Sequence, residues 1–207
     1  MSPNRVENLH LLDWKREVGA MYARARAASD RRAGWLDWRR TRDELFAHHP
    51  QSPLPTDERA GFAGLEYFDY DSGWRVLGDV READPQTYEI GTSGDGTYSF
   101  TRFATVHFAH GGTDMALELY WLEGYGGGLF LPFRDATSGR STYGAGRYLY
   151  DTIKGADLGT EDDRLVLDFN FAYNPSCAYD PRWVCPLAPP PNRLDVPIPA
   201  GEKHTGK

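Results

Sequence analysis

The fold is decided by the stretch Tyr98-Ser-Phe-Thr-Arg-Phe-Ala-Thr-Val-His-Phe-Ala-His110-Gly-Gly-Thr113-Asp-Met-Ala-Leu-Glu-Leu-Tyr-Trp-Leu-Glu123. Two runs rich in β-branched and aromatic residues, 98–109 and 114–123, flank a short segment that contains two glycines. Glycine readily adopts the positive φ of a tight turn, so the pattern predicts two antiparallel strands joined as a hairpin. Met115, Leu117, Leu119 and Trp121 share one face of the second strand, and Ala116, Glu118, Tyr120 and Leu122 share the other. Neither face is wholly polar, as expected if one face meets a barrel interior and the other meets a helix.

Further strands lie on both sides of this hairpin. The segment Thr92-Ser-Gly-Asp-Gly96 supplies glycines for a second hairpin turn. Alternating or apolar runs predict six more strands, at 65–70, 74–81, 87–91, 128–133, 146–151 and 165–170. Tight hairpin turns join antiparallel strands, whereas parallel strands need long crossovers, so the sheet is expected to be mostly antiparallel.

The first 50 residues have the period of helices. Asn4 and Glu7 have the spacing of a capping box, and apolar residues then follow at helical spacing through Ala25. A second apolar stripe that includes Trp35 and Trp38 must end before Pro50, because proline cannot continue a helix. The whole pattern predicts an α+β fold, with N-terminal helices packed on a mostly antiparallel, strongly bent sheet or barrel.

The length of 207 residues favours one domain with one sizeable core. Residues 1–50 are expected to form a helical pair that is part of this domain. Residues 51–200 form the antiparallel β body, which ends in a proline-rich strap over 186–199. Residues 201–207 are expected to be a disordered tail.

The charge distribution argues against a nucleic-acid-binding protein. Residues 1–50 hold 10 Lys+Arg against 7 Asp+Glu, and the remainder holds 13 against 23, so the main body is acidic and lacks a basic stripe. No apolar run approaches the roughly 20 residues of a membrane span, and residues 1–30 lack the apolar region of a signal peptide. We therefore expect a cytoplasmic protein that binds neither nucleic acid nor membranes.

Polar residues and glycines are dense between 129 and 177, which marks a candidate ligand site. Arg134 and Asp135 follow a strand that contains a proline, so they are expected at an edge or a strand end. Two glycines precede Arg147, and Tyr143 lies in the same segment. A guanidinium group pairs with a carboxylate or binds an anion, and its planar fork suits both. Asp135 fits an ordinary turn equally well, and Arg147 could be tied to an internal carboxylate.

A second polar cluster follows in Asp168-Phe-Asn-Phe-Ala-Tyr-Asn174. Asp168 and Asn170 are two residues apart, so on a strand they project from the same face. A buried Asp168 needs a charged partner, and Arg134 or Arg147 is the candidate. Asp168 is the candidate catalytic residue, as a general acid or base. Tyr173 and Asn174 complete the set of expected ligand contacts.

Cys177 and Cys185 bracket a turn-rich loop. Two cysteines are too few for a structural zinc site, and their spacing is not Cys-x-x-Cys, so we predict no metal site. Packed thiols and a disulfide are both compatible with the sequence. No compact catalytic signature is present, and the sequence indicates no particular cofactor.

These observations lead to two main hypotheses, and a third, thiol-dependent catalysis through Cys177, is the least favoured. The first is a pocket that binds a small anionic or carboxylate-bearing molecule around Arg134, Arg147 and Asp168, with or without catalysis. Replacing Arg147 by Met should then abolish binding and leave stability nearly unchanged. The second is a non-catalytic interaction or structural module, in which the polar cluster is an internal salt-bridge network or the helices present Trp14, Trp35 and Trp38 to an unidentified protein partner.

The chain resembles a family of uncharacterised bacterial and archaeal proteins, domain of unknown function 1684. The resemblance rests on Phe133-Arg-Asp-Ala-Thr-Ser-Gly139, Thr142-Tyr-Gly-Ala-Gly-Arg147-Tyr148 and Asp168-Phe-Asn-Phe-Ala-Tyr-Asn-Pro-Ser-Cys-Ala-Tyr179. It extends to Arg42-Asp-Glu-Leu-Phe46 and to Ala200-Gly-Glu202, and so covers nearly the whole chain. The resemblance implies one compact domain centred on residues 134–177, and it implies no activity.

Overall fold

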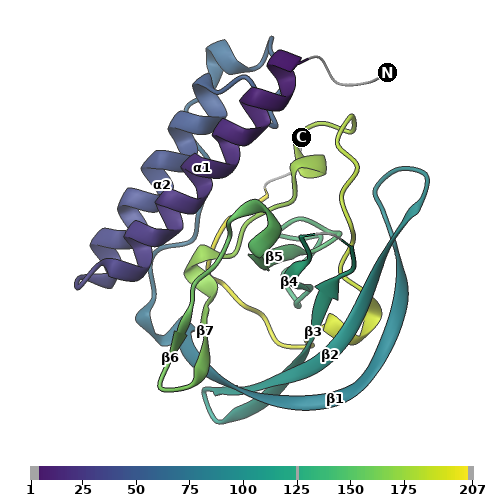
Figure 1. The fold of residues 1–207 in the computed structure, drawn as a ribbon. Helices are drawn as coiled ribbons and strands as arrows, with labels where there is room; N and C mark the ends of the chain where they lie inside the picture. Colours follow the sequence, from purple (N-terminus) through teal and green to yellow (C-terminus); the bar gives the residue numbers. More distant parts are fainter. Residues whose placement is uncertain (1–4, 125, 205–207) are drawn as a thin grey trace.

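A computed structural model describes residues 5–124 and 126–204. Two helices, α1 (Arg5–Ala27) and α2 (Arg31–His48), lie side by side against one side of the molecule (Figure 1). The Asp30 side chain begins α2 by accepting a hydrogen bond from the amide of Ala33, which satisfies one of the free donors of the first turn. The predicted cap at Asn4 lies outside the described residues.

Seven antiparallel strands form one sheet in the order β5-β4-β3-β2-β1-β7-β6. Their bounds are β1 Arg75–Gly91, β2 Thr97–His110, β3 Thr113–Leu122, β4 Gly128–Phe133, β5 Arg147–Asp151, β6 Thr160–Glu161 and β7 Arg164–Asp168. The helical pair and the antiparallel sheet confirm the α+β class.

The expectation of a strongly bent sheet or barrel is wrong, because the sheet is open and not strongly curled (Figure 1). Closure would require the edge strands β5 and β6 to pair with each other. The outer side of β5 is instead occupied by single bridges from Tyr148 to Tyr173 and from Asp151 to Ala156. The opposite edge strand, β6, has only two residues, which is too short to add a further strand.

The central hairpin is confirmed, with an irregularity in its pairing between Arg102 and Ala104, and two strand predictions on its N-terminal side change. Segments 74–81 and 87–91 form a single strand, β1, whose pairing with β2 is irregular between Glu82 and Gln86. Pro85 is tolerated there because β1 pairs with β7 only as far as Gly78, so no ladder donor is required on that side. Segment 65–70 is not a strand and makes one bridge, between Tyr67 and Glu202.

The core lies between the helical pair and the sheet. Trp38 on α2 is fully buried, and Leu117 on β3 and Leu167 on β7 belong to the same cluster. Trp35 is also buried, and Trp14 packs against the cluster. The three tryptophans therefore complete the core, which leaves little indole surface for a protein partner.

The expected disordered tail is wrong for residues 201–204. Glu202 is 1% exposed, and its amide donates a hydrogen bond to the carbonyl oxygen of Ala172. Gly201 makes this approach possible, since it has φ +80° and an added Cβ would lie 2.6 Å from Ala172 O and 2.7 Å from Phe169 O. A polar tail thus becomes part of the interior.

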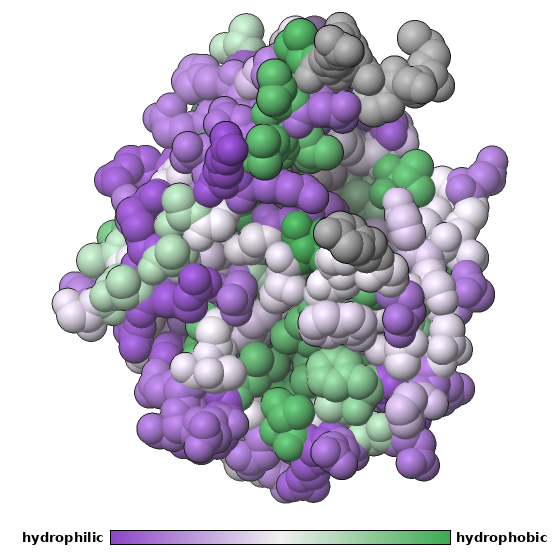
Figure 2. All heavy atoms as spheres, viewed as in Figure 1, coloured by the Kyte–Doolittle hydropathy of each residue, from purple (hydrophilic) through white to green (hydrophobic). Residues whose placement is uncertain are grey.

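The surface over the helical pair is mostly hydrophilic, and hydrophobic side chains gather where α1 begins (Figure 2). Val6, Leu9 and Leu12, in the first turns of α1, are exposed. Within residues 5–124 and 126–204, neither helix has the length and hydropathy of a membrane span.

Candidate functional site

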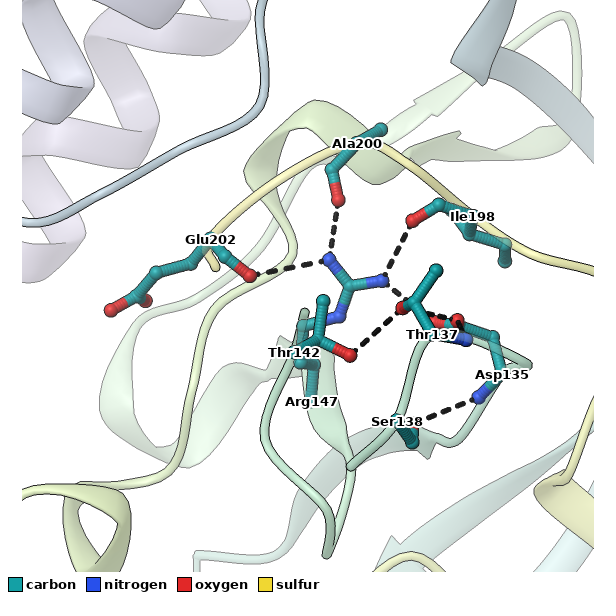
Figure 3. A network of polar contacts seen from close by, with 8 residues as sticks. All are labelled: Asp135, Thr137, Ser138, Thr142, Arg147, Ile198, Ala200 and Glu202. Atoms are coloured by element: carbon teal, nitrogen blue, oxygen red, sulfur yellow. Dashed lines mark hydrogen bonds and ion pairs between the residues drawn. The ribbon is translucent and has the colours of Figure 1, made fainter. Parts of the chain in front are cut away.

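Arg147 forms the centre of a buried polar network (Figure 3). Its Nη2 lies 2.7 Å from Asp135 Oδ2, and both side chains are 1% exposed. The guanidinium group also donates to the carbonyl oxygens of Ile198, near the end of the C-terminal strap, and of Ala200 and Glu202, which follow the strap. One arginine thereby joins β5, the turn after β4 and the end of the chain.

Asp135 is held by its own turn. Its Oδ1 accepts hydrogen bonds from the amide and the hydroxyl of Thr137, and that hydroxyl lies 2.8 Å from Thr142 Oγ1. This is the turn geometry expected for aspartate, which is the structural interpretation of Asp135. Burial lowers the pKa of Arg147, while the Asp135 carboxylate opposes this shift. The network is closed, and it favours a structural role for Arg147.

A second buried ion pair was missed by the sequence analysis. Arg42 Nη2 lies 2.8 Å from Glu202 Oε2, and Arg42 Nε donates to Tyr67 Oη at 3.0 Å. Arg42 also lies over the rings of Trp38 and Phe46, four residues away on either side. This spacing places Arg42 on the apolar face of α2, and it is the signal that could have revealed the pair.

Tyr173 and Asn174 lie beside this second pair. The amide of Asn174 donates to Glu202 Oε2 at 3.0 Å, and the ring of Tyr173 lies 5.1 Å from the Arg42 guanidinium carbon. Together with Tyr22 they line a cavity of about 60 Å³ between the helices and the sheet. Asn174 Oδ1 and Tyr22 Oη lack protein partners within the described residues, and ordered water commonly satisfies such atoms.

Asp168 is the last residue of β7 and is 3% exposed. Its Oδ1 accepts from the amide of Asn170 at 3.1 Å and from Asn170 Nδ2 at 2.8 Å. Burial raises the pKa of Asp168 to about 6, although these hydrogen bonds and the charges of Arg75 and Arg31 act in the opposite direction. The group can therefore hold or release a proton near neutral pH.

A cleft of about 110 Å³ opens beside Asp168, between the helix ends and the β6–β7 hairpin. We call it the Asp168 cleft; its polar lining residues are Arg26, Arg31, Arg75, Thr160, Glu161 and Asp168. Arg75 Nη2 lies 2.6 Å from Glu161 Oε2, and Arg31 Nη2 lies 3.7 Å from the same oxygen. Arg31 and Arg75 thus lie beside the Glu161 carboxyl group, and Arg26 lines the same cleft while its Nη1 lies 3.7 Å from Asp157 Oδ2.

The predicted grouping of Arg134 and Arg147 with Asp168 is wrong, since neither arginine lines the Asp168 cleft. The arginines that do line it lie in α1, α2 and at the start of β1, far from Asp168 in the sequence. The sequence analysis missed them because no local pattern links these segments. Only the pairing of β1 with β7, which places Arg75 opposite Asp168, brings the groups together.

Asn170 ties the end of β7 to two other segments. It lies in a 3₁₀ turn after β7 and not on the strand as predicted, and the Asp168 side chain caps this turn. Asn170 Oδ1 accepts from the amide of Asp71, and Asn170 Nδ2 donates to the Asp71 carbonyl oxygen. Trp35 Nε1 donates to the Asn170 carbonyl oxygen at 2.9 Å, which links α2 to this turn.

Arg134 and the two cysteines lie outside the lining of the Asp168 cleft. The Arg134 backbone pairs with the strap through Asn192 O and Leu194 N, at 2.8 Å each. Tyr143 Oη lies 3.8 Å from Cys177 Sγ, and neither Cys177 nor Cys185 is in a disulfide. In the described part of the chain, no three His, Cys, Asp or Glu side chains are grouped so that they could hold a metal ion.

Comparisons with known proteins agree with this architecture. No match was found among the curated proteins. The chain is similar to an uncharacterized protein of Haloarcula marismortui whose solution NMR structure has been solved, at 38% sequence identity and a TM-score of 0.59. The similarity covers 80% of this chain and 90% of the archaeal chain. A family model described as "Protein of unknown function (DUF1684)" matches residues 60–203, and the chain therefore belongs to the DUF1684 family.

Proposed function

We propose that the protein binds a small anionic, carboxylate-bearing molecule in the Asp168 cleft, and that Asp168 exchanges a proton with it. The observation that carries this proposal is a buried carboxyl group with a pKa near 6 beside three arginines. Desolvation raises the free energy of a charged carboxylate, and carboxyl groups with a raised pKa cluster at binding and catalytic sites.

The charge of the cleft depends on the protonation of Asp168. With Asp168 neutral, Arg26, Arg31 and Arg75 outweigh Glu161, and the lining carries a net positive charge. Arg75 supplies the best-placed donors, because it is the most buried of the three and lies next to Asp168 in the register. A guanidinium fork matches a carboxylate with two parallel hydrogen bonds.

Asp168 can act on such a ligand in two ways. Both hydrogen bonds that it accepts within the described residues fall on Oδ1, so Oδ2 is free to contact a ligand. In the neutral form, Oδ2 can donate a hydrogen bond to a ligand carboxylate or a proton to a leaving group. In the ionised form, it can accept a proton, and the arginines would stabilise negative charge that develops on the ligand.

The size of the cleft limits the ligand. A volume of about 110 Å³ is a few times the roughly 30 Å³ that one water occupies in the liquid. Short-chain mono- and dicarboxylates fit this size. Larger metabolites would have to extend past Arg31 and Glu161, whose side chains are each 42% exposed at the rim.

The proposal is tested by binding experiments with acetate, propionate, malonate and inorganic phosphate, followed by NMR on isotope-labelled protein at pH 5 and pH 8. If neutral Asp168 is the competent form, affinity should fall about tenfold per pH unit above 6, and therefore about 100-fold by pH 8. Arg75→Met should weaken binding at least tenfold. Arg164→Met is the matched control, because Arg164 lies on the same hairpin but outside the cleft lining.

Two outcomes would contradict the proposal. The first is saturable binding of a carboxylate that is equally strong in Arg75→Met and in the unchanged protein. The second is an affinity that is equal at pH 5 and pH 8, which would exclude a role for the proton on Asp168. Asp168→Asn distinguishes the hydrogen bond of residue 168 from its titration. Its amide still donates a hydrogen bond, but its charge no longer changes with pH.

The structural alternative has support at a different place. The closed network around Arg147 and Asp135 has the properties of an internal salt bridge, with each charged group buried and paired. We propose that this network holds the C-terminal strap against β5. A structural role for Arg147 and a ligand role for the Asp168 cleft are compatible.

A further inference from the structure

Two cysteines lie together where the C-terminal loop meets the β1–β2 turn. Cys177 is half-buried and Cys185 is 4% exposed, and both are free thiols. The Cys185 thiol hydrogen-bonds to the sulfur of Cys177, and Tyr143 Oη lies 3.8 Å from that same sulfur. The fold therefore pairs one accessible sulfur with one buried sulfur.

The backbone holds this pair in place. Ser93, in the β1–β2 turn, donates its amide to the Cys185 carbonyl oxygen at 2.9 Å and accepts from the Cys185 amide on its hydroxyl at 3.0 Å. Cys177 lies in a 3₁₀ turn, Ser176–Ala178, directly after Asn174-Pro175. Ser93 thus anchors Cys185, and the 3₁₀ turn positions Cys177, whose sulfur accepts the hydrogen bond of the Cys185 thiol.

The environment makes the two thiols chemically different. Hydrogen bonds from Cys185, Ser93 and Tyr143 lower the pKa of Cys177 to about 6, against the opposing effect of burial. The hydrogen bond to Cys177 and burial raise the pKa of Cys185, although the charge of Lys154 acts in the opposite direction. Tyr143 keeps its proton, since burial raises its pKa to about 12. One sulfur is therefore a nucleophile at neutral pH, and its neighbour is a proton-bearing thiol.

We propose that Cys177 is a hydroperoxide-reactive residue and that Cys185 resolves its oxidised form as an intramolecular disulfide. In the first step the Cys177 thiolate attacks one peroxide oxygen, the O–O bond breaks, hydroxide or alkoxide leaves, and Cys177 becomes a sulfenic acid. In the second step the Cys185 sulfur attacks the Cys177 sulfur. The sulfenic oxygen leaves with the Cys185 proton as water.

The electron balance is complete with peroxide as the named oxidant. The peroxide gains two electrons, and the two thiols lose them and form one S–S bond. An external dithiol restores both thiols and is itself oxidised. A half-buried thiolate with a buried partner fits this chemistry, because a sensor cysteine must be reached by oxidant and then protected from further oxidation. The inference does not depend on the Asp168 cleft.

The first experiment is treatment of the reduced protein with one molar equivalent of hydrogen peroxide, followed by tryptic digestion without reductant and mass spectrometry. Arg182 lies between the cysteines, so trypsin separates them and an intramolecular disulfide joins two peptides of one chain. We expect this linked pair in the unchanged protein and its loss on adding dithiothreitol. Cys185→Ser should instead accumulate a sulfenic acid at Cys177 that dimedone traps, and Cys177→Ser should give neither product.

The second experiment is the pH dependence of iodoacetamide alkylation at Cys177, with free cysteine as the reference. We expect a midpoint near pH 6 and a rate at pH 6 that is about tenfold above that of free cysteine, because the higher thiolate fraction outweighs the lower nucleophilicity. Tyr143→Phe should raise the midpoint. A midpoint above pH 8, equal peroxide consumption by Cys177→Ser, or a disulfide formed only between two chains would each overturn the inference.

Discussion

Replacing Arg147 by Met should destabilise the protein severely, which is the reverse of the sequence-based expectation. The substitution removes the partner of a carboxylate that is 1% exposed, and it also removes the donors to the carbonyl oxygens of Ile198, Ala200 and Glu202. Removing one member of a buried ion pair costs about 3–5 kcal/mol, because the other charge is left uncompensated. Those carbonyl oxygens add to this cost if they are left without any hydrogen-bond donor, and water that enters the site and binds them reduces the cost.

We therefore expect Arg147→Met to lower the free energy of unfolding by about 5 kcal/mol, out of a total of about 5–15 kcal/mol for a domain. Urea denaturation followed by tryptophan fluorescence and circular dichroism measures this directly. Arg24→Met is the matched control. Arg24 forms a 2.9 Å ion pair with Asp37 but is 48% exposed, so its loss should cost under about 1 kcal/mol.

A double-mutant cycle shows whether the loss belongs to the pair. Asp135→Asn keeps the carbonyl oxygen that Thr137 uses, removes the charge, and replaces the Oδ2 acceptor of Arg147 with an amide NH₂ group. The double variant should be less destabilised than the sum of the single variants, with a coupling of about 1–3 kcal/mol. If Arg147→Met costs no more than Arg24→Met, or if the two substitutions at Arg147 and Asp135 add without coupling, the buried-network account is refuted.

Two further predictions concern Asp168 and Gly201. Because the folded pKa of Asp168 is raised from 3.8 to about 6, the unchanged protein should lose stability as pH rises from about 4 to 6; Asp168→Asn should lack this loss. By urea denaturation, Asp168→Asn should be more stable than the unchanged protein by up to about 3 kcal/mol above pH 7, and the two should be equally stable near pH 4. Equal stability at pH 8 would contradict a buried carboxylate that destabilises the fold when it is charged. Gly201→Ala should lower the free energy of unfolding by about 3 kcal/mol. Gly111→Ala is the control and should lower it by about 1 kcal/mol, because φ is also positive there but no atom lies close to the added Cβ. Equal losses would mean that the close approach of residue 201 to Ala172 and Phe169 does not affect stability.

Local patterns predicted the elements well. The glycine turn at 111–112 predicted the hairpin of β2 and β3, and the apolar spacing through Trp35 and Trp38 predicted helix α2, whose apolar face packs in the core. These signals are local, because a turn or a helix face is encoded within a few residues. The open sheet was not predictable in the same way. It depends on what covers the outer side of β5, and the covering residues Tyr173 and Ala156 belong to other segments.

The position of the buried polar residues was also predictable from local sequence, whereas their partners were not. The stretch 129–177 contains Asp135, Arg147 and Asp168, all of which are buried. Their partners could not be assigned, because a charge pair forms across the fold and any carboxylate in the chain could satisfy a given arginine. Glu202 illustrates this limit most clearly: it follows a proline-rich strap and resembles a solvated tail, yet it is buried and neutralises Arg42 on α2.

The carbon-13 NMR titration of the Asp168 carboxyl carbon, in the free protein and with a saturating short-chain carboxylate, tests the central claim most directly. The account predicts a pKa near 6 in the free protein, because the group is buried. It predicts a further rise when the ligand binds, because a second negative charge then favours the neutral form. A pKa near 4 in the free protein, or a value that the ligand does not change, would contradict a proton-exchanging anion site at Asp168.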